Sequence, residues 1–166
     1  MTQPPFAAPQ SKQEVVNLLT TYRNKFSEVL HDLTDDELLR VPGPQKNRSM
    51  KDLLAHLIWW EEYMMMRVLL VKTGITSFPT QDNDKINEMV FQMHRELSLE
   101  VVRESFQFSL HRLLGFIDWL TWDEIEGDLS SDGRPVAYLI AGNTFGHYVE
   151  HLDAVSRYID SLRISG

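Results

Sequence analysis

The feature that most constrains the fold is a helical spacing of apolar residues that recurs along almost the whole chain. Ser11 followed by Glu14 has the form of a capping box, which marks the beginning of a helix. This signal and the apolar spacing predict a helix from about residue 12 to 32. Its apolar residues, three or four apart, are Val15, Leu18, Leu19, Tyr22, Phe26, Val29, Leu30 and Leu33.

Further cap signals divide the rest of the chain into more helices. Ser49 predicts the start of a second long helix, which Gly74 ends. A third helical stretch begins at Asp82 or Asn83 and bends or breaks at Ser98, which is a second start signal. A last helix is expected from about 136 to 163. Short turns or loops are expected at Thr34, at 42–44, through Pro79, at Thr121 and from Ser130 to Pro135.

These segments predict an all-α protein. No stretch alternates apolar and polar residues in the way that a half-buried strand does, so we expect no sheet. Four long helices with short connectors indicate a four-helix bundle. Residues 1–10 contain three prolines and are expected to form a disordered N-terminal lead-in, with residues 11–166 as a single bundle domain.

Composition and charge narrow the class of protein. The chain has no cysteine, which excludes disulfides and thiolate metal sites, and 43% of its residues are hydrophobic, enough for a core. A net charge of −8 argues against nucleic acid or an anionic membrane as a partner. The most apolar stretch, 53–71, is interrupted by Glu61, Glu62 and Arg67, so it is not a comfortable membrane span. We expect a soluble cytoplasmic protein.

Three histidines are the strongest candidates for a functional site. His147 and His151 are four residues apart, so on a helix they lie on one face and point to one place. His56 lies in the second long helix, where a bundle would bring it opposite the pair. Three imidazoles can hold a divalent ion such as zinc, nickel or iron and leave a position open for a substrate. The alternative is that the histidines are structural, as a single histidine on an apolar stripe usually is.

Other side chains near these histidines are candidates for catalysis. Asn143 precedes His147 by one turn and is expected to hydrogen-bond a substrate or a water there. Tyr63 and Glu62 follow His56 and are candidates for a general acid or base. Asp52, one turn before His56, is a candidate to orient its ring.

The chain as a whole, from about Ser11 to Leu162, resembles the DinB/YfiT-like four-helix bundles, and among them the ClbS/DfsB family. The resemblance lies in SMKDLLAHLIWW (49–60), DKINE (84–88), ELSLEVV (96–102) and IAGNTFGHY (140–148). It implies a bundle with a long crossover connection, often a homodimer. It also implies a divalent metal held at the positions that His56, His147 and His151 match here.

Three hypotheses for the function remain open. The first is a metal-dependent enzyme, a hydrolase or thiol transferase that acts on a small reactive metabolite. The second, implied by the ClbS/DfsB resemblance, is a resistance protein that binds and hydrolyses a small electrophile through side chains, without a metal. The third is a non-enzymatic helical dimer.

Overall fold

A computed structural model describes residues 9–45, 47–75, 82–127 and 135–164. Of the expected lead-in, residues 1–8 lie outside the described residues, as do part of the loop through Pro79 and most of the loop at 130–135. The helices are, in chain order, α1 (Lys12–His31), α2 (Asp35–Leu39), α3 (Met50–Lys72), α4 (Asn83–His94), α5 (Leu99–Trp119), α6 (Trp122–Glu126), α7 (Val136–Asn143) and α8 (Phe145–Ile164). The described residues form no strand, which confirms the all-α prediction.

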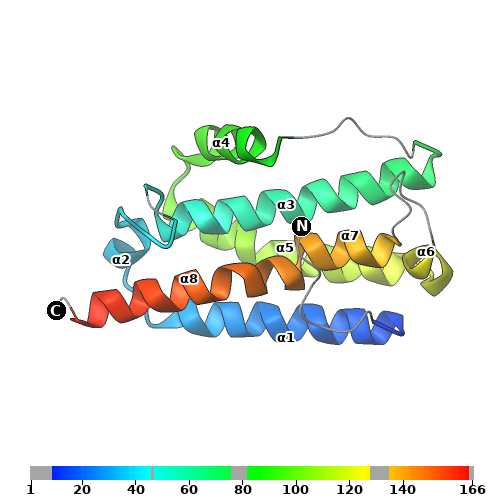
Figure 1. The fold of residues 1–166 in the computed structure, drawn as a ribbon, viewed down its shortest axis with the longest axis horizontal. Helices are drawn as coiled ribbons and strands as arrows, with labels where there is room; N and C mark the ends of the chain where they lie inside the picture. Colours follow the sequence, from blue (N-terminus) through cyan, green and yellow to red (C-terminus); the bar gives the residue numbers. More distant parts are fainter. Residues whose placement is uncertain (1–8, 46, 76–81, 128–134, 165–166) are drawn as a thin grey trace.

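Four long segments form the bundle: α1, α3, α5 and the consecutive helices α7 and α8. Neighbouring pairs are α3 with α5, α3 with α7, α1 with α8, and α1 with α5. Figure 1 shows that α1 and the α7–α8 segment run in one direction, while α3 and α5 run in the other. The bundle therefore consists of two pairs of parallel neighbours, α1 with the α7–α8 segment and α3 with α5, and the two pairs run in opposite directions. As a result, α3 lies antiparallel to the segment that carries His147 and His151.

The crossover connection runs through α4. Because α3 and α5 are parallel, the chain has to return along the bundle between them, and α4 lies along α3 on the outside of the bundle (Figure 1). Of its residues only Val90 is buried. The predicted break at Ser98 is confirmed, since Ser98 caps the start of α5 by accepting a hydrogen bond from the Val101 amide.

The predicted helix starts are confirmed at their caps. Ser11 caps α1, and complete capping boxes begin α2 at Thr34, α3 at Ser49 and α6 at Thr121. Gly74 follows the end of α3 with φ +88°, a left-handed conformation that glycine adopts without steric cost. Local side-chain chemistry thus determines where each of these helices begins or ends.

The expectation of one continuous helix from 136 to 163 was wrong. Thr144 has φ −129° and ψ −109°, which ends α7 and separates it from α8. Two side chains at the break donate to carbonyls four residues earlier: Asn143 Nδ2 to Leu139 O at 2.8 Å and Thr144 Oγ1 to Ile140 O at 2.7 Å. Such back-bonding competes with the helical ladder and bends helices. The bend lies three residues before His147.

A buried polar network ties the four bundle segments together at their centre. Arg23 of α1 donates to Glu61 of α3 at 2.6 Å and to the Tyr148 hydroxyl of α8 at 2.8 Å. On α5 it donates to Ser109 Oγ at 2.8 Å and to the Phe106 carbonyl. All of these side chains are buried. The apolar core surrounds this network.

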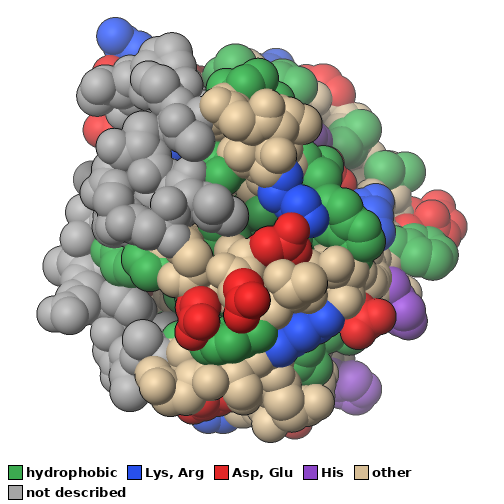
Figure 2. Space-filling view, turned by 90° about the vertical axis from the view of Figure 1, so that its right-hand side faces the viewer, with side chains coloured by type: hydrophobic (Ala, Val, Ile, Leu, Met, Phe, Trp, Pro, Cys, Tyr) green, Lys and Arg blue, Asp and Glu red, His purple; other side chains and the backbone are tan. Residues whose placement is uncertain are grey.

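Two ion pairs join neighbouring helices at the end of the bundle where α3 stops and α6 lies. Lys72 pairs with Glu124 at 2.8 Å, and Lys12 with Asp118 at 3.7 Å. Figure 2 shows acidic and basic side chains interspersed on this face rather than one sign gathered in a patch. Among the described residues, no helix combines the length and apolar character needed to span a bilayer.

Replacing Gly43 with alanine is expected to destabilise the loop that leads into α3. A Cβ at Gly43 would lie 2.4 Å from the Arg48 carbonyl oxygen, which also accepts a hydrogen bond from the Gly43 amide. Because the obstacle is backbone, the loop must shift, at a cost of about 1–3 kcal/mol. Gly142→Ala is the matched control, since its Cβ meets nothing within 4 Å. Urea unfolding of both variants measures the difference, and equal stabilities would contradict the expectation.

Candidate metal centre

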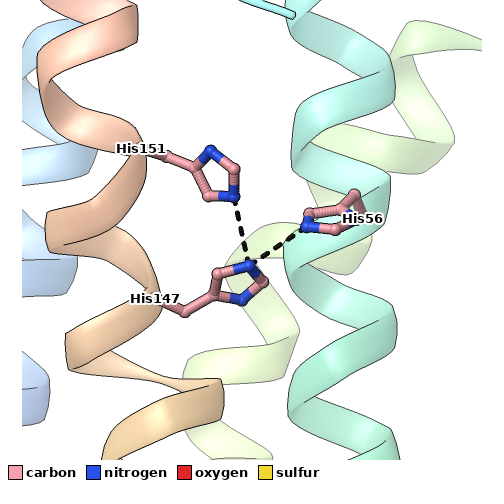
Figure 3. A group of neighbouring side chains, drawn as sticks. All are labelled: His56, His147 and His151. Carbon is pink, nitrogen blue, oxygen red and sulfur yellow. Dashed lines mark hydrogen bonds between the residues drawn. The ribbon is translucent and has the colours of Figure 1, made fainter. Parts of the chain in front are cut away.

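The bundle brings the three predicted histidines together. His56 projects from α3, and His147 and His151 project from consecutive turns of α8 toward it (Figure 3). His147 Nε2 lies 3.1 Å from His56 Nε2 and 3.1 Å from His151 Nε2. One potential ligand atom from each ring lies within 4.8 Å of the others. The antiparallel packing of α3 against the α7–α8 segment creates this cluster from residues about 90 positions apart in the chain.

Hydrogen bonding alone does not satisfy this arrangement. A neutral imidazole nitrogen carries either one proton or one lone pair. His147 Nε2 therefore makes one good hydrogen bond, yet two nitrogens lie 3.1 Å from it. Three lone pairs directed at a shared cation resolve the conflict, because each nitrogen then binds the cation instead of a neighbouring ring.

The environment keeps the three imidazoles neutral. Burial, followed by the charges of His151 and Arg48, lowers the pKa of His56 to about 3. Burial lowers the pKa of His151 to about 4. Burial, followed by the charges of His151 and His56, holds the pKa of His147 well below its ordinary value. Neutral rings at physiological pH are the form that binds metal.

Two of the nitrogen separations in the cluster fit a metal ion. Two imidazole nitrogens bound about 2.1 Å from one ion, at an angle of about 100°, are about 3.2 Å apart. The observed 3.1 Å is close to this value. Nitrogen ligands of this kind suit zinc, nickel and iron, and three of them leave room for a further ligand. The donor set and these two separations therefore fit the divalent ion that the sequence suggested.

The ring nitrogens that point away from the cluster are less completely supported. Gln45 Nε2 lies 3.4 Å from His151 Nδ1, and turning its amide by half a rotation presents the oxygen to that nitrogen. His56 Nδ1 and His147 Nδ1 are buried and have no hydrogen-bond partner among the described residues. The expectation that Asp52 orients His56 was wrong, because Asp52 instead accepts from Ser49 in the capping box of α3.

Aromatic side chains of α3 lie beside the histidines. The Trp60 ring centre is 6.3 Å from both the His56 and the His147 ring centres, and its Nε1 donates to Asn87 of α4 at 3.1 Å. Tyr63 is two turns after His56 on the same side of α3. Its ring stacks on Trp59 at 5.1 Å and meets the edge of Trp60 at 5.4 Å. These rings form an apolar, water-excluding flank to the cluster.

The two other catalytic candidates are placed differently. Asn143 ends α7, across the Thr144 break from His147, and its amide donates to Leu139 O. Glu62 is six residues after His56, which places it on another side of α3. It is half exposed and pairs with Arg112 of α5. The structure therefore does not bring Glu62 to the histidines.

Two residues of this region were not foreseen from the sequence. Gln45 contacts His151 from a loop, where no periodicity identifies a partner. Glu61 meets Tyr148, the neighbour of His147, in the buried network. The position of Glu61 inside an apolar helical run was the signal available in the sequence for a buried ion pair, because a buried carboxylate is usually paired.

The family follows from the comparison with known sequences. The family model described as the DinB superfamily matches residues 18–154. The chain belongs to the DinB superfamily. No curated protein matches this DinB-superfamily chain.

Solved structures share the DinB-like fold. The colibactin self-resistance protein ClbS, in complex with double-stranded DNA, has a TM-score of 0.80 at 18% identity, with 92% of this chain and 97% of that one covered. DfsB, described as a sibling lethal factor precursor, has a TM-score of 0.78 at 16% identity over 93% and 98%. An uncharacterised protein from Escherichia coli UTI89 has a TM-score of 0.77 at 17% identity, with 94% of this chain and 96% of that one covered. At these identities the similarity shows the fold. The DNA in the ClbS structure is at odds with the expectation of no nucleic-acid partner.

Acid is expected to destabilise the metal-free protein between about pH 6.5 and pH 3. In the unfolded chain the histidines bind protons near their ordinary pKa, whereas in the folded protein the pKa is about 3 for His56 and about 4 for His151. The unfolded state binds more protons across this window, so stability that is complete above about pH 6.5 falls as pH falls. Each histidine contributes a slope of about 1.4 kcal/mol per pH unit.

Urea unfolding of chelator-treated protein at about pH 7 and about pH 5 measures this slope. His56→Gln removes one of the titrating rings and is expected to flatten it. His111→Ala is the control, because His111 is exposed on α5 and is expected to leave the slope unchanged. Identical slopes in the wild type and the His56 variant would contradict the expectation.

Proposed function

We propose that this protein is a metal-dependent enzyme, a hydrolase or thiol transferase, that acts on a small reactive metabolite. The observation that carries the proposal is the convergence of two Nε2 atoms, from His56 and His151, on His147 Nε2. A divalent ion held by these residues would supply Lewis-acid chemistry. It would polarise the electrophilic substrate, or lower the pKa of the water or thiol that attacks that substrate. The resemblance to DinB-like proteins supports the same ligand set.

The chain's own residues would hold and shield the reacting molecule. Trp60 and Tyr63 would keep bulk water from one side, and Gln45 would steady His151 from the other. We assign Tyr63 the part of general acid or base, because it shares a side of α3 with His56. Asn143 already donates one amide N–H to Leu139 O, so only its second N–H and its Oδ1 would serve the substrate, which makes it the weaker of the two.

A second candidate function is hydrolysis of a small electrophile without a metal, as a resistance protein. The fold shared with ClbS favours it, at an identity that carries no residue roles to this chain. Here Tyr63 would carry the reaction and the histidines would bind or orient the substrate. We also propose that the protein is a homodimer, which light scattering of the purified chain tests.

A single activity experiment separates the candidates. Protein purified without a histidine tag is assayed for the hydrolysis of a model epoxide, and for its conjugation with a low-molecular-weight thiol, before and after chelation. Activity that chelation abolishes and zinc, nickel or ferrous iron restores supports the metal-dependent enzyme. Activity that survives chelation but is lost in Tyr63→Phe supports the metal-free alternative. No metal uptake from any of these ions would overturn the first proposal.

A further inference from the structure

We propose that the hollow between α4 and the loop residues 44–45 and 47–48 binds a carboxylate group of the small molecule that reacts at the histidine cluster. This inference rests on the proposed function and adds a substrate class to it. The hollow has a volume of about 580 Å³. Its lining residues are Pro44, Gln45, Asn47, Arg48, Glu88 and Phe91.

The hollow and the histidine cluster share a neighbouring residue, Gln45. Gln45 lines the hollow and also places its amide 3.4 Å from His151 Nδ1. Arg48 lines it as well, one residue before the cap of α3, and its charge contributes to the lowered pKa of His56. A molecule seated in the hollow would therefore lie against Gln45, one side chain away from His151.

Arg48 is the group that selects for a carboxylate. Its guanidinium lies 4.9 Å from the centre of the Phe91 ring, and its Nη2 donates to Glu88 Oε2 at 3.0 Å. Among the described residues this is the hydrogen bond that the Arg48 side chain makes, and it uses one of the five N–H donors of the guanidinium group. The planar fork matches a carboxylate, with which it forms paired, charge-assisted hydrogen bonds.

Glu88 holds Arg48 in place and also competes with the ligand. The Arg48 side chain is 21% exposed and the Glu88 side chain 58%, so the glutamate is the more accessible and more readily displaced partner. Glu88 Oε1 accepts from Gln92 at 2.7 Å, and this hydrogen bond and Arg48 lower the pKa of Glu88. An ionised Glu88 keeps Arg48 oriented and repels an incoming anion.

The rest of the lining defines the body of the ligand. Phe91 and Pro44 offer apolar surface, and the side chains of Gln45 and Asn47 offer amide donors and acceptors. The combination suits a short apolar or amide-bearing chain that ends in a carboxylate. The opposite end of such a chain would carry the group that reacts at the histidines.

The test uses full-length protein loaded with cobalt(II), whose visible absorption reports its ligands. The probes are hydroxamates, which bind the metal, with either a carboxylate or a methyl group at the far end of matched chains of several lengths. In wild-type protein at one of these lengths the carboxylate probe is expected to bind about tenfold more tightly than the methyl probe. In Arg48→Ala this preference is expected to disappear while cobalt uptake is unchanged.

Two further variants sharpen the result. Glu88→Gln removes the competing carboxylate, so the preference for the carboxylate probe is expected to increase. Arg95→Ala removes a half-exposed arginine that pairs with Glu96 and lines no part of the hollow, so it is expected to change nothing. Equal affinities for both probes at every length in cobalt-loaded wild-type protein would overturn the carboxylate subsite alone. Failure to take up cobalt would overturn the metal centre, and with it the subsite.

Discussion

Replacing Arg23 with alanine is expected to destabilise the protein by on the order of 3–5 kcal/mol. The guanidinium is buried and contacts Glu61, Tyr148 and Ser109. Its removal leaves the Glu61 carboxylate buried without a countercharge, and Glu61 Oε2 already has no hydrogen-bond partner among the described residues. Uncompensated buried charge is among the largest costs that one substitution produces. Urea unfolding at neutral pH measures the loss.

Two controls separate the buried charge from other effects of losing an arginine. Arg112→Ala breaks an ion pair whose side chains are about half exposed, so the expected cost is below about 1 kcal/mol. Arg23→Met combined with Glu61→Leu leaves no charge at the centre and is expected to be more stable than Arg23→Ala. If Arg23→Ala cost no more than Arg112→Ala, the network would not be a main determinant of stability.

Replacing His147 with alanine is expected to abolish stoichiometric metal binding. His147 supplies the nitrogen that lies 3.1 Å from both of the others, so its loss removes the centre of the cluster. Loss of a residue that only supports a ligand lowers metal affinity about 10–100-fold, and loss of a ligand is expected to exceed this. A calorimetric titration of chelator-treated protein with zinc measures the change in metal affinity.

A second readout comes from thermal unfolding. Zinc at about one hundred times its dissociation constant is expected to stabilise the wild type by about 2.7 kcal/mol, because it binds the folded state. The His147 variant is expected to show no such stabilisation, whereas His111→Ala is expected to behave as the wild type does. Zinc binding of equal strength in the wild type and the His147 variant would contradict the metal centre.

The helices could be predicted from the sequence because their signals are local. Ser11, Ser49 and Ser98 each cap the helix that was expected to follow them. A hydroxyl that accepts a hydrogen bond from an amide three residues away needs no distant partner. The positions of the three histidines could be predicted for the same reason in part, since the i, i+4 pair needs only that its segment is helical.

The interruption at Thr144 could not be predicted in this way. The sequence 136–163 has helical spacing throughout, and threonine and asparagine are tolerated within helices when their side chains point to solvent. Thr144 is buried, and its hydroxyl donates to Ile140 O. Burial decides that the hydroxyl bonds to the backbone, and burial depends on the neighbouring helices.

The carboxylates were predicted less well than the histidines. Glu61 and Glu62 are adjacent and have the same chemistry, yet Glu61 lies at the centre of the bundle and Glu62 pairs with Arg112 near the surface. The difference is a rotation of about 100° around α3, together with the helices that α3 contacts. Neither the presence of Arg23 opposite Glu61 nor that of Gln45 beside His151 is encoded by local spacing.

The sequence by itself determined the all-α class, the starts of the helices that side chains cap and the three histidines, because these depend on interactions within a few residues of the chain. The tertiary structure alone decided that His56 meets His147 across two helices, that Glu61 is buried, and that Arg48 faces a hollow beside the histidines. The physical reason is the packing of antiparallel and parallel helices around one core. That packing selects which face of each helix is buried, and therefore which distant side chains come into contact.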